Sequence, residues 1–404
     1  MTAGFEAMWS LLHEVGRDAR TGGYRRYAWT RADHELREWF AGEASARGLD
    51  LTLDRAGNQW AWWGDPDAAA AAGTPGVVAG SHLDSVPDGG AFDGPLGVVS
   101  AFAALDLLRD LLRARGVPPR RPVGVVNFVD EEGARFGVAC AGSRLITGAM
   151  APDAARALRD NEGVSMGEAL QAAGRRPGEV GRDEEALRRV GTFVELHDEQ
   201  GRGLVELGAP VGVASSIWPH GRWRAVLPGE ANHAGTTRLE DRRDPMLAYA
   251  RLVLAAREAA VRHGTVATCG KVLVEPNGIN AIASSVTGWL DARGASADAV
   301  RAAVAELAEL VEAEGGALTP ESWTDETAFA PALRDRLAAR LDAPVLATGA
   351  GHDAGILANA GVPTAMLFVR NPTGVSHSPA EFAEPADCAS GVEALAAVLE
   401  DLAA

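Results

Sequence analysis

The sequence of 404 residues lacks several features that would assign a protein class directly. Its three cysteines, Cys140, Cys269 and Cys388, are widely spaced and form no C-x-x-C pair, so neither a disulfide scaffold nor a thiolate zinc site is expected. No apolar run approaches the ~20 residues that a membrane helix needs. The first twenty residues lack the basic start and long apolar stretch of a secretory signal, so the expected location is cytoplasmic.

An excess of positive charge is also missing. The chain has 38 basic and 55 acidic side chains, a formal net charge of -17, and no basic patch interrupts this balance. Because such a surface repels a phosphate backbone, nucleic acid is not an expected partner. The one G-x-S-x-G string, Gly163–Gly167, does not follow a predicted strand, so it does not read as the nucleophile elbow of a serine hydrolase of the α/β type.

What is present predicts two domains, because the chain is longer than one core usually organises and 47% of its residues are hydrophobic. Short apolar runs at Gly76–Ala79, Val123–Val129 and Thr192–Leu196 alternate with helical segments such as Leu96–Arg115. This alternation is typical of an α/β fold with a mixed, mostly parallel sheet and helices on both faces. Further expected elements are a helix over Phe5–Val15, a second helix opening at Thr30, strands at Leu51–Leu53 and Gln59–Trp63, and a late strand at Thr364–Val369.

The rhythm changes between residues 211 and 325, where strands and helices are predicted in the order βαββαβ. This order is the split-βαβ plan of a small ferredoxin-like domain. We therefore expect an inserted domain at 211–325 and a larger domain formed by 1–210 and 326–404.

Histidines and acidic residues follow several of the predicted strands. His82 and Asp84 end one strand, and a glycine-rich loop leads from them to Asp93. Alternate strand positions share a face, so Asp84 can hold one nitrogen of the His82 ring while the other binds a metal. Considered without the other segments, this one is also explained by a polar loop between a strand and a helix.

The second candidate is the acidic run Asp130-Glu131-Glu132 directly after a buried strand. Three adjacent carboxylates near a sheet end repel each other unless a cation lies there, although a solvated acidic turn would also explain them. Neighbouring carboxylates can divide the work, with one as metal ligand and the other as general base.

His197 and His377 lie at two further strand ends. A lone histidine is more often structural than a ligand, but these segments should meet at one edge of the sheet. Together the candidate donors are nitrogen and oxygen atoms without sulfur, which suits Zn²⁺, Mn²⁺, Co²⁺ or Ni²⁺. If Asp93 bridges, two divalent metal ions each receive three protein ligands, from the set His82, Asp93, Glu132, His197 and His377.

These segments, taken in order along nearly the whole chain, resemble the M20 metallopeptidase-like amidohydrolases, and specifically their hydantoinase/carbamoylase branch. That branch contains allantoate amidohydrolases and N-carbamoyl-L-amino acid hydrolases. The matching segments are Gly80–Gly97, Glu131–Phe136, Glu195–Gly201, Gly229–Thr237, Asn277–Ile282, Asp291–Arg293, Gly349–Ala354 and Gly374–Pro379.

The resemblance implies one metal held by His82, Asp93 and His197 and a second held by Asp93, Glu132 and His377. It implies Glu131 as general base and Asp84 as the residue that orients His82. The inserted domain would be a lid and dimerisation module of a homodimer. The implied substrate-binding residues are His233, which would polarise the scissile carbonyl in the partner's site, Asn280 and Arg293, which would bind the substrate carboxylate, and Gln200.

The expected function is hydrolysis of a ureido or carbamoyl C–N bond in a small ureido acid, with allantoate as the first choice. The alternatives are an N-carbamoyl-L-amino acid hydrolase, including a β-ureidopropionase or ureidoglycolate type, and a dipeptidase-like peptidase. A noncatalytic metal-binding relative is disfavoured because Glu131, which the metal does not need, is present. Asp198, Arg202 and Ala283 depart from the common family pattern beside the site, which leaves substrate choice more open than metal chemistry. The stretch Trp218–Arg222 and His352 are given no role.

Overall fold

The computed structural model describes residues 3–404 and separates them into two compact units. The large unit is Met1–Ser215 with Ala328–Ala404, and the inserted unit is Ser216–Thr327. The sequence prediction set these boundaries at 211 and 325. Among the described residues, none of the helices has the length and apolar character needed to cross a membrane.

A nine-stranded sheet forms the centre of the large unit. Its middle strands β4 (Val123–Phe128), β3 (Gly76–His82), β5 (Val190–Asp198) and β15 (Thr364–Val369) are parallel. The pairs β1–β2, β2–β4 and β15–β6 are antiparallel, which makes the sheet mixed. The outer strands are β1 (Asp50–Leu53), β2 (Gln59–Trp63), β6 (Val211–Ile217), β13 (Thr327–Ala328) and β14 (Val345–Thr348). The predicted mostly parallel α/β architecture is confirmed.

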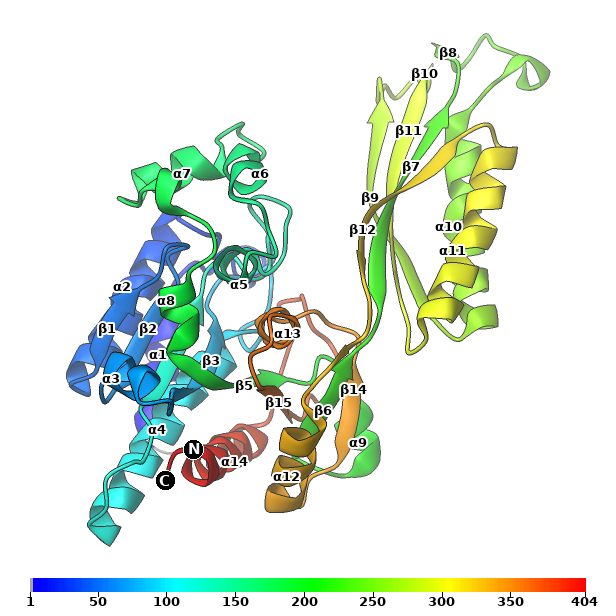
Figure 1. Cartoon of the computed structure of the whole chain (residues 1–404). Helices are drawn as coiled ribbons and strands as arrows, with labels where there is room; N and C mark the ends of the chain where they lie inside the picture. The colour runs from blue at the N-terminus through cyan, green and yellow to red at the C-terminus, as the bar shows by residue number, and fades with distance from the viewer. Residues whose placement is uncertain (1–2) are drawn as a thin grey trace. The chain divides into compact units, whose positions relative to one another are not determined.

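Helices cover both faces of this sheet (Figure 1). The parallel strands are buried on both sides, so they read as continuous apolar runs rather than as alternating ones. Val77 and Leu196 belong to the core shared with α4 (Pro95–Arg115) and α14 (Pro385–Ala403). The other helices of the unit are α1 (Ala3–Leu12), α2 (Arg31–Ala46), α3 (Pro66–Ala71), α5 (Ala141–Thr147), α6 (Pro152–Ala157), α7 (Met166–Ala172), η1 (Pro177–Glu179), α8 (Glu184–Arg188), α9 (Gly203–Leu207), α12 (Pro331–Leu341) and α13 (Asp353–Asn359).

The first helix is shorter than predicted, because α1 ends at Leu12 and Val15 lies outside it. The buried guanidinium of Arg26 donates hydrogen bonds to the carbonyl oxygens of Leu12, at 2.6 Å, and of Val15, at 2.9 Å. A side chain distant in sequence thus binds the carbonyl groups at the helix end. Hydrophobic spacing alone does not reveal such a contact.

The inserted unit has a four-stranded antiparallel sheet in the order β12–β7–β11–β9. Both of its long helices pack on one face of that sheet, around Leu252, Leu290 and Leu307 (Figure 1). A short pair of strands, β8 (Asn232–His233) and β10 (Ala281–Ile282), was not predicted. The bounds of the main elements are β7 (His220–Pro228), η2 (Leu239–Asp241), α10 (Pro245–His263), β9 (Val266–Glu275), β11 (Ser285–Arg293), α11 (Ala297–Ala313) and β12 (Ala317–Thr324).

Candidate metal centre

The candidate donors gather at the carboxyl edge of the parallel strands in the large unit. His82 is the last residue of β3, the acidic run follows β4, and His197 lies near the end of β5. His377 lies in the loop after β15. Strands that run in the same direction bring these ends together, which is why an α/β sheet forms its sites there.

The first donor set is His82, Asp93 and His197, all buried. The Oδ1 atom of Asp93 lies 3.5 Å from His82 Nε2 and 3.2 Å from His197 Nε2. Neither Nε2 atom has a hydrogen-bond partner among the described residues, although both are buried. Two unpartnered ring nitrogens facing one carboxylate oxygen are a donor set suited to a metal ion.

The second donor set is Asp93, Glu132 and His377. His377 Nε2 lies 3.3 Å from Oδ2 of Asp93 and 3.6 Å from Oε2 of Glu132. The other oxygen of Glu132, Oε1, is buried and has no donor within the described part of the chain. The two sets use different oxygens of Asp93, so this carboxylate is placed to bridge them.

The protein holds the opposite nitrogen of each buried imidazole. His82 Nδ1 lies 3.2 Å from the backbone carbonyl of Asp84, and His197 Nδ1 lies 3.0 Å from that of Asp198. A carbonyl oxygen only accepts, so each Nδ1 carries the proton and each Nε2 keeps its lone pair for a metal. The Asp84 carboxylate is farther from His82, at 3.5 Å, and accepts the backbone N–H groups of Glu131 and Glu132 instead. Asp84 therefore contacts both His82 and the acidic loop.

Gly94 lets the loop that carries Asp93 return to His82. Its backbone has φ +85°, in the region that favours glycine, and a Cβ atom there would lie 2.4 Å from the His82 ring. The glycine-rich segment thus permits the close approach that the sequence predicted.

Glu131 lies beside the first donor set, with Oε2 3.7 Å from His82 Nε2. Burial raises the pKa of Glu131 well above its usual range, and the charges of Asp353 and Glu132 raise it further against the opposing effect of His82. Burial and the charge of Asp93 likewise raise the pKa of Glu132 to about 7. Carboxylates crowded in this way favour a bound cation, which would stabilise their charged forms.

Gln200 lies in the same cluster, where its Nε2 donates to Oδ2 of Asp93 at 2.8 Å and to the Ser376 hydroxyl at 3.1 Å. The predicted substrate-binding residue thus contacts the bridging carboxylate. Glu381, which sequence reasoning missed, accepts the backbone N–H groups of Phe92 and Asp93 and the hydroxyl of Ser376. Its only sequence signal is an acidic residue four positions after His377. Gln200 thus binds the carboxylate of Asp93, and Glu381 binds its backbone N–H group.

The other predicted substrate residues belong to the inserted unit. His233 and Asn280 are exposed neighbours, because the pairing of β8 with β10 sets His233 opposite Ala281. Arg293 is at the far end of β11, where it pairs with Asp291 at 2.6 Å. The nine residues from Ser285 to Arg293 span roughly 26 Å of extended strand. One inserted unit therefore does not bring Asn280 and Arg293 to the same point.

Comparison with known proteins places these residues in a wider context. Residues 78–401 match peptidase family M20/M25/M40. The chain is 38% identical to an N-carbamoyl-L-amino acid amidohydrolase of Geobacillus stearothermophilus, over 96% of each chain. It is 34% identical to an allantoate amidohydrolase of Escherichia coli, over 97% of this chain and 96% of the relative. The structure of a hydantoinase/carbamoylase family amidase from Burkholderia vietnamiensis superposes with a TM-score of 0.85 at 29% identity, covering 99% of this chain and 97% of that one.

Proposed function

The chain belongs to peptidase family M20/M25/M40, and we propose that it is a metal-dependent amidohydrolase that cleaves a ureido or carbamoyl C–N bond of a small carboxylic acid. The observation that carries this proposal is the pair of donor sets that share Asp93, with Glu131 beside them. Its relatives named above act on bonds other than peptide bonds, which favours an amidohydrolase over a dipeptidase.

The donor atoms fit divalent metal ions. The buried Nε2 atoms of His82 and His197 and the Oε1 atom of Glu132 have no hydrogen-bond partner in the described structure, and such atoms are costly unless they bind something. Imidazole and carboxylate donors without sulfur suit Zn²⁺, Mn²⁺, Co²⁺ or Ni²⁺. Because Asp93 offers one oxygen to each set, we propose two ions, each with three protein ligands.

Bound divalent ions supply Lewis-acid polarisation of a carbonyl and lower the pKa of a water molecule. Glu131 is the residue placed to take the proton from that attacking water and to return it to the leaving nitrogen. A group in this position must both accept and release a proton during the reaction, which a carboxylate can do. Gln200, Ser376 and Glu381 hold Asp93 while the proton moves.

We also propose that two copies of the chain complete each site. Arg293 ends β11, and Asn280 precedes the short strand β10 that leads into the other end of β11, so a carboxylate held by both needs a second subunit. His233, next to Asn280, would enter the partner's site together with it. Two features of the inserted unit support pairing of copies: β9 is an edge strand, and Leu254 and Val261 of α10 are 67% and 75% exposed beside it.

Allantoate is our first choice of substrate, as the sequence predicts. The higher identity to the Geobacillus N-carbamoyl-L-amino acid amidohydrolase favours a carbamoyl amino acid as the second candidate. Both carry a carboxylate next to the carbon that bears the ureido nitrogen, which a guanidinium such as that of Arg293 binds as a fork.

The test is turnover of allantoate, N-carbamoyl amino acids and ureidoglycolate by the purified protein, before and after removal of metal with a chelator. Chelation should abolish activity, and Mn²⁺, Co²⁺, Ni²⁺ or Zn²⁺ should restore it. Full activity in protein shown to be metal-free would contradict the proposal. Turnover of dipeptides alone would return the enzyme to the peptidase class.

A further inference from the structure

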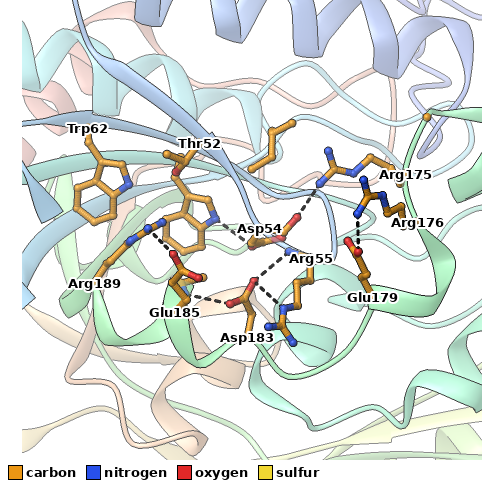
Figure 2. A pocket seen from close by; sticks show the side chains of 14 residues that line it. Thr52, Asp54, Arg55, Trp62, Arg175, Arg176, Glu179, Asp183, Glu185 and Arg189 are labelled. Atoms are coloured by element: carbon orange, nitrogen blue, oxygen red, sulfur yellow. Dashed lines mark hydrogen bonds and ion pairs between the residues drawn. The ribbon is translucent and has the colours of Figure 1, made fainter. Parts of the chain in front are cut away.

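A cavity of about 330 Å³ lies in the large unit between the β1–β2 hairpin and residues 174–189 (Figure 2). None of the candidate metal donors lines it. Its wall is polar and carries both signs of charge. The charged lining residues are Asp54, Arg55, Arg175, Arg176, Glu179, Asp183, Glu185 and Arg189.

The acidic side chains of the cavity already have partners. Asp54 accepts the backbone N–H groups of Gly57 and Asn58 and the indole N–H of Trp60. Asp183 accepts the backbone N–H groups of Arg55 and Ala186. The last two acids form ion pairs, Glu179 with Arg176 at 2.8 Å and Glu185 with Arg189 at 3.0 Å. The carboxylates therefore leave little capacity for a cation, and the described residues form three-donor sets only around Asp93.

Arg175 differs from the other arginines of the cavity. Its Nη2 donates to the backbone carbonyl of Asp54 at 2.7 Å, but it forms no ion pair with any carboxylate of the described residues. Figure 2 shows its side chain reaching toward the cavity beside Asp54. A partly buried guanidinium without a carboxylate keeps several donors and a full positive charge for a ligand.

Arg37 adds a second positive charge close behind Arg175. Its Nη2 donates to the carbonyl of Gly57, and its Nη1 is buried without an acceptor. A Cβ atom on Gly57 would lie 3.6 Å from Arg175 Nε and 4.0 Å from Arg37 Nη2, so the two guanidiniums flank one residue. Burial lowers the pKa of Arg37, and although Asp33 opposes this effect, the charge of Arg175 lowers it further. This side of the cavity thus holds two guanidinium groups, neither of which forms an ion pair with a carboxylate of the described residues.

We infer that this cavity binds a small organic anion whose carboxylate or phosphate group is held by Arg175. The planar guanidinium matches either group with two parallel hydrogen bonds. Arg55, in the turn between β1 and β2, supplies a second donor. Its side chain is 55% exposed, and its Nε lies 3.9 Å from the Asp183 carboxylate. The volume lies at the lower end of the range for small-molecule sites, so the ligand is of metabolite size.

The test uses the metal-loaded, full-length protein, with inorganic phosphate and succinate as probes in separate calorimetric titrations. Arg175→Gln removes the positive charge. The affinity of the cavity for the probe should then fall by at least about tenfold, the equivalent of one charge-assisted hydrogen bond. Arg176→Gln is the matched control: it lines the same cavity but is already paired with Glu179, so it should leave that affinity unchanged. The probe with the higher affinity identifies the anionic group.

Crystals soaked in selenate separate this site from the metal centre, because selenium is located by its anomalous scattering. A peak within hydrogen-bond distance of Arg175 in the wild type, absent in Arg175→Gln, is expected. Equal affinities in wild type and Arg175→Gln, or selenium found only at the metal donors, would overturn the inference. If circular dichroism shows that Arg175→Gln does not fold, Arg175→Lys replaces it: the charge stays, the fork is lost, and affinity should still fall severalfold.

Discussion

Mixing two inactive variants tests whether His233 acts in the partner's site. Glu131→Gln removes the proposed base from the large unit, and His233→Ala removes the proposed carbonyl-polarising group from the inserted unit. Each homodimer then lacks one group in every site. A heterodimer of the two contains one site with both wild-type groups and one site with neither, if the inserted unit of one copy serves the other.

The size of the recovery follows from this geometry. One of two sites works in each heterodimer, and random exchange makes about half of the dimers heterodimers, so activity should return to about a quarter of the wild-type value per subunit. The reason to expect a partner's contribution is the span of roughly 26 Å along β11 between Arg293 and Ser285, the end of the strand nearer to Asn280 in the chain.

The assay is ureido acid turnover after subunit exchange, with heterodimers quantified by native mass spectrometry of differently tagged chains. A matched control pairs Glu131→Gln with His82→Ala. Both groups lie in the large unit, 3.7 Å apart, so each site of that heterodimer keeps one defect and no activity should return.

A heterodimer that forms but shows no more activity than its parents would refute the composite site and return His233 to its own subunit's site. If activity also returns when Glu131→Gln is mixed with His82→Ala, the recovered activity does not come from complementation between two subunits. The two readings are therefore separable within one experiment.

Three further comparisons of variants test single residues. Glu131→Gln should keep near-normal metal content by elemental analysis while kcat falls by at least ~10²-fold, whereas His377→Ala should lower metal occupancy; equal metal loss in both would contradict the assigned roles. Arg293→Ala should reduce kcat/KM for a carboxylate substrate by the equivalent of ~1.5 to 3 kcal/mol and hardly change it for the neutral amide. A wild-type enzyme that turns over the acid and its amide equally would exclude binding of the substrate carboxylate by Arg293. Gly94→Ala should lower stability by at least about 1 kcal/mol in denaturant unfolding and weaken metal binding, because its Cβ meets His82; Gly116→Ala, also at positive φ but in open space, should share only the loss of stability.

The large-unit fold could be predicted because its signals are local. Each parallel strand is a short apolar run, and each is followed by the polar residues that face the site. The end of α1 could not be predicted, since it depends on Arg26, which is distant from Leu12 in the sequence. The β8–β10 pair was missed for the same reason: two residues from each of two separate loops do not form a readable pattern.

Strand order predicts that the donors gather at one edge of the sheet, whereas their division into two sets around Asp93 was implied by the family resemblance. The residues that hold Asp93 are harder to find. Glu381 acts through backbone N–H groups of Phe92 and Asp93, and an acid that binds backbone has no required spacing to the groups it serves. Gln200 was predicted to bind substrate, but its contact with the bridging carboxylate appears only in three dimensions.

The separation of the two units has a consequence for specificity. The metal donors and Glu131 lie within one unit, where a change alters the chemistry itself, while His233, Asn280 and Arg293 lie in the other. Because the proposed substrate contacts come from a different part of the fold, and for His233 and Asn280 from a second copy, they can change without disturbing the Asp93 cluster. Substrate preference can therefore change while the donors stay the same, and the chain is similar both to an allantoate amidohydrolase and to an N-carbamoyl-L-amino acid amidohydrolase. The determinants of substrate choice should then be sought in the inserted unit, and exchange of residues 216–327 between such relatives should transfer substrate preference while metal content stays constant.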